Sequence, residues 1–191
     1  MKTMKNLTMI IVMSAMTALV ASCGGSKGVA PTQGAVEIEV PCQNYFSDTQ
    51  FFRGVGDGKS QDMNTARLKA HTNASAELAA GIQQHIGRVV ENYRKEMDVA
   101  KQQQFGQSFQ AKIRTTVDQI VSNTAVACTK TLREKDGSYS VYMALEVNKD
   151  EVLTQVSKAA IADKEIQLLF DSERFNQTYN EELERYAKQR Q

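Results

Sequence analysis

The sequence predicts an α+β fold: a single domain in which a small antiparallel sheet is packed by long helices, followed by a long C-terminal helix. Two observations predict this fold class. Apolar residues recur at steps of three and four through long stretches of the chain, as on one face of an α-helix. In other stretches apolar and polar residues alternate, as they do in half-buried strands.

Four strands are expected. The first is residues 36–40, where three apolar residues alternate with two glutamates before Pro41 ends the run. A second short strand is expected within residues 49–56. Two more flank Asp136-Gly137, because Asp-Gly between β-rich runs is typical of a hairpin. In the last strand five apolar side chains fall on one face: Tyr139, Val141, Met143, Leu145 and Val147.

Three helices are expected. The first follows Asp62 as its N-cap and carries small or apolar residues along one face: Ala66, Ala70, Ala74, Leu78, Ile82, Ile86, Val89, Val90, Tyr93 and Met97. A second helical pattern runs from Phe105 to Val121, with Gly106 as a break. The last helix is expected to start near Asp150 and to continue to Tyr186.

The segment FRGVGDGKSQD, residues 52–62, looks like a phosphate-binding loop because Gly58-Lys59-Ser60 precedes a helix. A P-loop needs another glycine at position 53, which is Arg53, and a dinucleotide fingerprint needs different glycine spacing. The segment is therefore predicted to be a sharp strand-to-helix turn. The alternative is a small-ligand or anion-binding protein, or an enzyme, that uses the turn residues Gly54, Gly56, Gly58, Lys59 and Ser60.

The first 22 residues have the layout of a secretory signal: two lysines, a short apolar run and small residues. Val20-Ala21-Ser22-Cys23 resembles the bacterial lipobox, which implies cleavage before Cys23 and a covalent diacylglycerol and N-acyl lipid (palmitate) on it. A plain signal peptide is the alternative. Several acyl chains hold a protein on a membrane without a spanning helix. With Gly24 next, the outer membrane facing the periplasm is the expected location.

Residues 23–35 are rich in glycine and small polar residues and are expected to form a flexible tether. The α+β domain is placed at residues 36–172 and a C-terminal helical extension at 173–191. Without residues 1–22, the chain has 21 basic and 22 acidic side chains. This balance argues against a nucleic-acid partner.

Cys42 and Cys128 remain once Cys23 is lipidated. In an oxidising compartment they are candidates for a disulfide, and two buried free thiols are the alternative.

The C-terminal extension carries an apolar stripe on an otherwise charged surface: Phe175, Tyr179, Leu183 and Tyr186. Such a stripe packs either on the domain itself or on a partner helix. Association with peptidoglycan through this helix is a further alternative.

The Gly-x-Gly segment, the alanine-periodic helix that closes on Glu77-Leu78-Ala79 and the downstream hairpin DGSYSVYMALEV together resemble the family of the twenty-kilodalton bacterial outer-membrane lipoprotein. The N-terminal domain of a flagellar T-ring protein has the same fold. The resemblance covers roughly residues 51–158. It implies a helix-and-sheet domain without catalysis, found in envelope or motility-associated assemblies, and brings no catalytic residues.

Other chemistry finds little support in the sequence. His71 and His85 are expected about 21 Å apart along one helix, too far to share a metal ion. No zinc-ligand spacing and no nucleophile elbow is present, so neither a metal site nor an enzyme is predicted. The expected function is a non-enzymatic lipoprotein of the cell envelope, a structural or adaptor module that contacts the membrane and other envelope proteins and needs no cofactor.

Overall fold

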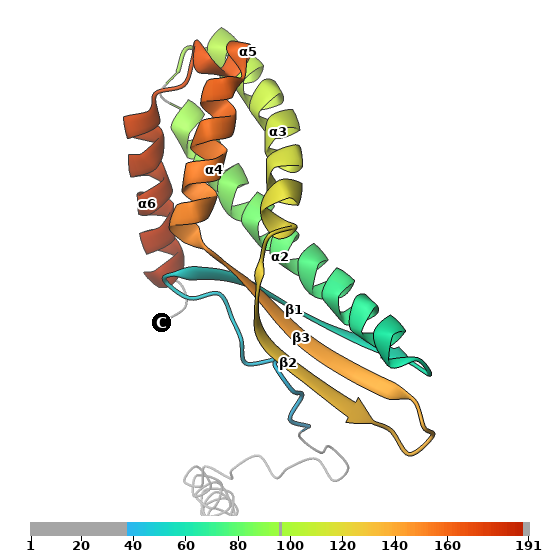
Figure 1. The fold of residues 1–191 in the computed structure, drawn as a ribbon. Coiled ribbons are helices and arrows are strands. Elements are labelled where there is room, and N and C mark those ends of the chain that lie inside the picture. Colours follow the sequence, from blue (N-terminus) through green and yellow to red (C-terminus); the bar gives the residue numbers. More distant parts are fainter. Residues whose placement is uncertain (1–37, 96, 189–191) are drawn as a thin grey trace, which may run out of the picture. The chain divides into compact units, whose positions relative to one another are not determined.

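The structure is a computed structural model that describes residues 38–95 and 97–188, without the side chains of residues 186 and 187 (Figure 1). Cys23, the expected tether and residues 36 and 37 lie outside the described part of the chain. Residues 38–40 are described and are not in a strand, so the strand predicted there is wrong for these three residues. Alternation alone supplies no neighbour with which a strand could pair.

The described residues form an α+β fold with one three-stranded sheet. The strands are β1 (Phe51–Ser60), β2 (Ala125–Arg133) and β3 (Tyr139–Asn148). The helices are α2 (Met63–Arg94), α3 (Val99–Val121), α4 (Lys149–Ala162), α5 (Lys164–Gln167) and α6 (Ser172–Lys188). In this part of the chain no helix is both long and apolar enough to span a membrane.

The sheet is antiparallel and has the order β1-β3-β2, so β3 is the central strand (Figure 1). In the register of β1 with β3, Phe52 lies opposite Val147 and Gly58 opposite Val141. The predicted apolar face of β3 is confirmed, because Val141, Met143, Leu145 and Val147 are buried in the core.

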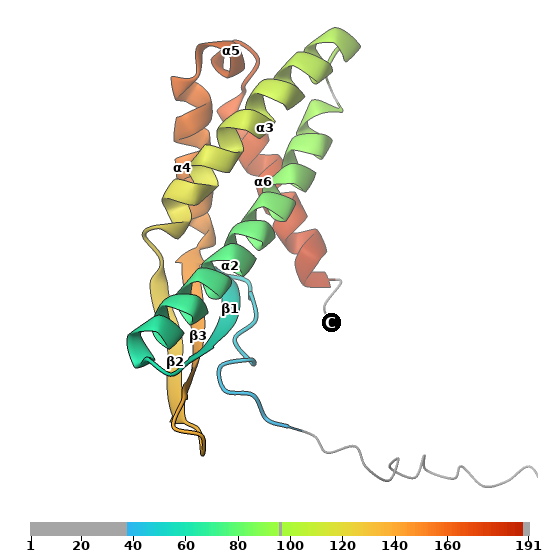
Figure 2. The ribbon, with the colours of Figure 1, turned by 90° about the vertical axis from the view of Figure 1, so that its right-hand side faces the viewer.

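Helix α2 takes part in both halves of the domain (Figure 2). Its first half lies on the sheet, and its second half packs against α3 and α6 beyond the end of the sheet. An aromatic cluster fills the helical half: Tyr93, Phe105, Phe109, Phe170 and Phe175. The core is therefore continuous from the sheet to the far end of the helices.

Local capping explains where the helices begin. The carboxylate of Asp62 accepts a hydrogen bond from the Thr65 N–H at 2.8 Å, as the sequence predicts for an N-cap. Gly106 lies inside α3 and does not break it; the break between α2 and α3 comes earlier, after Arg94.

The single helix predicted from Asp150 to Tyr186 is divided into α4, α5 and α6. Asp163 adopts an extended conformation and its carboxylate caps α5, while the Asp171 carboxylate accepts from the N–H of Arg174 at the start of α6. Each of these two aspartates starts a new helix, because its carboxylate accepts from free backbone N–H groups at that helix N-terminus.

Candidate interaction sites

The glycines of β1 lie against the backbone of α2. A Cβ atom on Gly54 would lie 2.5 Å from the Ala74 carbonyl oxygen, and one on Gly56 2.6 Å from that of Ala70. A Cβ atom on Gly58 would likewise collide with the backbone of Ala66 and Ala70. No side chain fits at these distances, so the three glycines allow strand and helix to touch.

The spacings of the two elements explain this contact. Two residues along a strand advance about 6.6 Å, and four residues along a helix advance about 6 Å. The glycines at every second position of β1 therefore have nearly the same spacing as the alanines at every fourth position of α2, so each glycine lies opposite an alanine.

The turn predicted at Gly54 to Ser60 is wrong, because these residues belong to β1 throughout. The anion-binding hypothesis depended on glycines that open a helix, and it loses this geometric basis. The Lys59 ammonium lies 3.5 Å from the Asp136 carboxylate, and the Ser60 hydroxyl accepts from the Asp62 N–H. Successive backbone N–H groups of a strand point to opposite sides, so those of β1 do not converge on one anion.

Helix α2 also closes the outer edge of β1. Lys69, Asn73 and Glu77 lie four residues apart and form one row beside the strand. Their side chains bond its backbone: the Lys69 Nζ donates to the Lys59 carbonyl (3.1 Å), the Asn73 amide donates to the Asp57 carbonyl (2.8 Å), and the Glu77 carboxylate accepts from the Val55 N–H (3.1 Å). Farther along, the Ser47 hydroxyl accepts from the Arg53 N–H (2.9 Å). The β1 edge is thus occupied along most of its length.

The opposite edge of the sheet, the side of β2 that faces away from β3, is here called the open edge. Within residues 38–95 and 97–188, the backbone of β2 makes hydrogen bonds to β3 only. Its side chains are exposed or half-buried, and Val126 and Leu132 keep 51% and 45% of their surface accessible. A bulge between Val126 and Cys128 interrupts the pairing, and the register is regular from Cys128 to Arg133.

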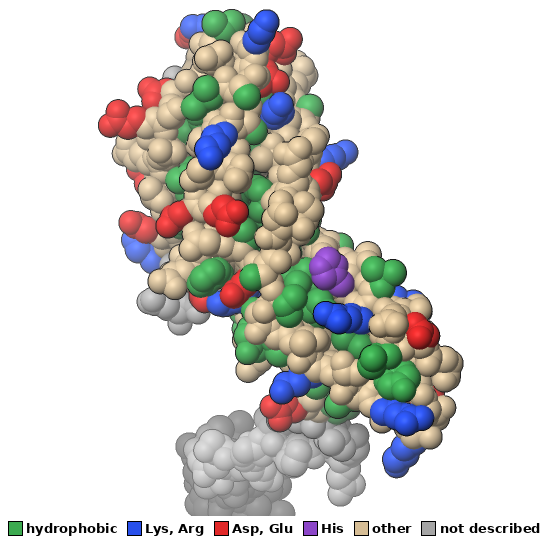
Figure 3. All heavy atoms as spheres, in the orientation of Figure 1, with side chains coloured by type: hydrophobic (Ala, Val, Ile, Leu, Met, Phe, Trp, Pro, Cys, Tyr) green, Lys and Arg blue, Asp and Glu red, His purple; other side chains and the backbone are tan. Residues whose placement is uncertain are grey.

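The open edge is basic. Lys130 and Arg133 are exposed, and no acidic residue lies within β2. The Arg133 guanidinium lies 5.8 Å from the centre of the Tyr139 ring, and Lys130 makes no ion pair within the described residues. On the face drawn in Figure 3, acidic and basic side chains are otherwise interspersed.

A disulfide joins Cys42 to Cys128, with 5.8 Å between the Cα atoms. Cys128 pairs with Ala144, whereas the neighbouring β3 residues Met143 and Leu145 face α2. The bridge therefore lies on the sheet face opposite α2 and ties the segment before β1 to β2. On that face Arg53 also bonds Asp48 (2.6 Å) and Glu146 (2.7 Å).

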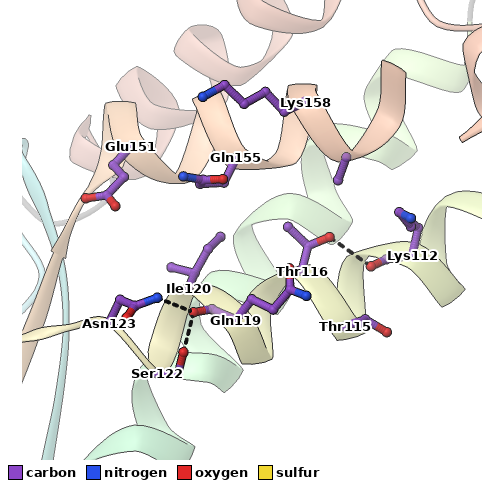
Figure 4. Close-up of a pocket in the computed structure, with 11 residues that line it drawn as sticks. Lys112, Thr115, Thr116, Gln119, Ile120, Ser122, Asn123, Glu151, Gln155 and Lys158 are labelled. Carbon is purple, nitrogen blue, oxygen red and sulfur yellow. Dashed lines mark hydrogen bonds between the residues drawn. The ribbon is translucent and has the colours of Figure 1, made fainter. Parts of the chain in front are cut away.

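A polar hollow of 560 Å³ lies between α3 and α4 (Figure 4). Long side chains from both helices surround it, among them Lys112, Gln119, Glu151, Gln155 and Lys158. Within the described residues none of these side chains has a hydrogen-bond or ion-pair partner of its own. The hollow ends at Ser122 and Asn123, two residues before β2 begins.

The apolar stripe of α6 packs inside the domain. Phe175 and Tyr179 are fully buried against α2 and its neighbours, and Leu183 is half-buried. The Tyr179 hydroxyl donates to the Lys149 carbonyl at 2.8 Å. The stripe is therefore not a surface for a partner helix at Phe175 and Tyr179; the side chain of Tyr186 lies outside the described part.

His85 is buried between the rings of Phe52 and Tyr179, 5.3 and 4.9 Å from their centres. Burial, with the nearby charges of Lys149 and Arg88, lowers the pKa of His85 to about 4. The imidazole is thus neutral at ordinary pH. The sequence did not predict these contacts, because Phe52, His85, Lys149 and Tyr179 lie in four separate elements, β1, α2, α4 and α6.

His71 is exposed and its ring nitrogen lies 3.4 Å from the Ser75 hydroxyl. Within residues 38–95 and 97–188, no group of three or more His, Cys, Asp or Glu side chains could hold a metal ion. In comparisons with known proteins, no family model, no curated protein and no solved structure matches this chain.

Proposed function

We propose that the protein is a lipid-anchored structural or adaptor module of the bacterial cell envelope, held at the outer membrane with its domain in the periplasm. The observation that carries this proposal is the sequence Val20-Ala21-Ser22-Cys23 directly after a short apolar run. Acyl chains on Cys23 would anchor the chain, since each buried CH₂ contributes about 0.8 kcal/mol.

The disulfide supports export. Bridges between cysteines are stable in oxidising compartments such as the periplasm and rare in the cytosol. Cys42 and Cys128 are the cysteines left after lipidation of Cys23, and they lie at bonding distance. A chain that pairs them in this way suits the compartment that the lipobox implies.

The adaptor role is supported by surfaces that the domain leaves uncovered. The open edge of β2 and the hollow between α3 and α4 follow each other along the chain, and both present groups able to bind a partner. The order of elements, with a glycine segment, an alanine-lined helix and a hairpin, fits the proposed membership in the family of twenty-kilodalton outer-membrane lipoproteins.

The anchor is tested by replacing the acylated residue. Cys23→Ser should abolish incorporation of labelled palmitate and move the protein from the outer-membrane fraction to a different fraction. Ser26→Ala, three residues farther on in the expected tether, is the matched control and should leave both unchanged. Equal palmitate labelling of the two variants would contradict the proposal.

A further inference from the structure

We propose that the open edge of β2 binds an extended acidic segment of another envelope protein, which joins the sheet as a fourth strand. This inference rests on the proposed function and deepens it by naming a surface and the chemistry of the partner. Three features of the described residues lead to it: the different hydrogen bonding of the two sheet edges, the charge of β2, and the hollow at the end of β2.

The two edges of the sheet differ in how their backbone groups are satisfied. Along β1, side chains of Lys69, Asn73 and Glu77 bond the outward-facing groups. Along β2 no helix supplies such a row within the described part of the chain. Unpaired N–H and C=O groups at an edge are a template for another strand. The fold thus closes one edge and leaves the other available.

The positive charge of β2 favours a partner strand with acidic side chains. Lys130 and Arg133 are the charged residues of β2 and project from opposite faces of its regular part. The adjoining hollow adds Lys112 and Lys158 against the single carboxylate of Glu151. An acidic segment would neutralise these side chains. A second copy of β2 would instead place basic side chains among basic side chains, and like charges on paired strands are destabilising.

The bulge limits the length and pattern of the partner. Regular pairing runs from Cys128 to Arg133, so about six partner residues can pair. Lys130 and Leu132 pair with Tyr142 and Ser140 and share the face opposite α2. Acidic residues at every second position would therefore meet Lys130 on that face. Beyond the bulge, a longer partner would reach Ser122 and Asn123 at the end of the hollow.

The test uses the full chain in non-ionic detergent and a fluorescent hexapeptide, Glu-Val-Glu-Val-Glu-Val, with anisotropy as the readout. The same peptide with lysine in place of glutamate tests charge. Two further peptides carry N-methyl groups on the odd or on the even amides. Only one of these sets can face β2, so strand addition predicts that one methylated peptide fails and the other binds.

The protein variants locate the site. Lys130→Glu combined with Arg133→Glu should weaken binding of the acidic hexapeptide at least tenfold. Arg67→Glu, at an exposed position of α2, is the matched control and should leave the affinity within twofold. Amide hydrogen exchange should show new protection in β2 when the peptide is bound, which would separate a bound strand from loose ionic contact.

Three results would overturn the inference. The first is no binding of the acidic hexapeptide, which would leave Lys130 and Arg133 with the role of preventing aggregation at the sheet edge. The second is equal binding of both methylated peptides, which would show attraction without strand pairing. The third is protection of β2 by self-association without peptide. None of these results bears on palmitate labelling of Cys23, so the proposed lipid anchor and the proposed partner site can be refuted independently.

Discussion

Gly56 shows how strictly a single residue can be determined by a neighbouring element. A Cβ atom there would collide with the backbone of α2 at Ala70, which cannot yield as a flexible side chain could. We expect Gly56→Ala to lower the free energy of unfolding by about 3 kcal/mol, at the upper end of overpacking costs. Chemical denaturation followed by circular dichroism measures this change.

Gly81 is the control for this substitution. It lies exposed on α2 with no atom within 4 Å of a Cβ position. Gly81→Ala should raise stability by about 0.5–1 kcal/mol, because alanine favours the helix. Similar losses for both variants would show that β1 and α2 are not in contact as described.

His85 makes stability depend on pH. Its folded pKa of about 4 lies below the unfolded value of 6.5, so the unfolded chain binds the proton more readily. Stability is therefore full above pH 6.5 and falls as the pH drops toward 4. The loss amounts to about 3 kcal/mol, because one pKa unit corresponds to about 1.4 kcal/mol.

Unfolding curves between pH 7.5 and pH 4.5 would measure this dependence. His85→Gln should flatten the decline across this window, while the same substitution at the exposed His71 should leave it in place. If His85→Gln kept the full decline, other groups would be responsible for the acid sensitivity.

At the scale of elements, α6 packs its apolar side chains into the helical half. Phe175 packs against the rings of Tyr93 and Phe109, and Tyr179 lies over His85. Phe175→Ala should cost about 3–5 kcal/mol in thermal or chemical unfolding, the usual loss for a buried aromatic residue. Glu184→Ala, at an exposed position of the same helix, should change stability by less than about 0.5 kcal/mol. A small effect at Phe175 would restore α6 as a candidate partner helix.

The sequence predicted the fold class, the Asp62 cap and the apolar face of β3, because each of these depends on a local pattern. The strand expected within residues 49–56 corresponds to the first part of β1, which begins at Phe51. The residues from Gly54 to Ser60 are wrongly predicted as a turn, since glycine is rare in strands and the reason for the three glycines is contact with helix α2. The matching of alternate glycines to every fourth alanine was nevertheless present as a signal.

Candidate sites were harder to predict than elements. The open edge of β2 follows from the order of strands and from the row of side chains that closes β1, neither of which a single segment reveals. The hollow between α3 and α4 likewise combines residues about 40 positions apart. Such sites arise from topology, so periodicity in the sequence does not indicate them.

At the scale of the whole molecule, the disulfide links the segment before β1 to the edge strand β2. Cys42 and Cys128 are 86 residues apart, so the bridge removes much of the freedom of the unfolded chain. The chain-entropy model gives a stabilisation of about 3–5 kcal/mol for a loop of this length. Cys42→Ala with Cys128→Ala should lower the free energy of unfolding by that amount.

The same bridge should make the wild-type protein sensitive to its redox environment, because reduction releases the segment before β1 from β2. Unfolding of the wild-type chain with reducing agent should coincide with that of the double alanine variant. The variant itself should unfold identically with and without reductant, since it has no bridge to lose. Thiol titration shows whether the reductant has opened the bridge. If the bridge is open and the wild-type unfolding curve is unchanged, the ion pairs of Arg53 with Asp48 and Glu146 are sufficient to hold this face of the sheet.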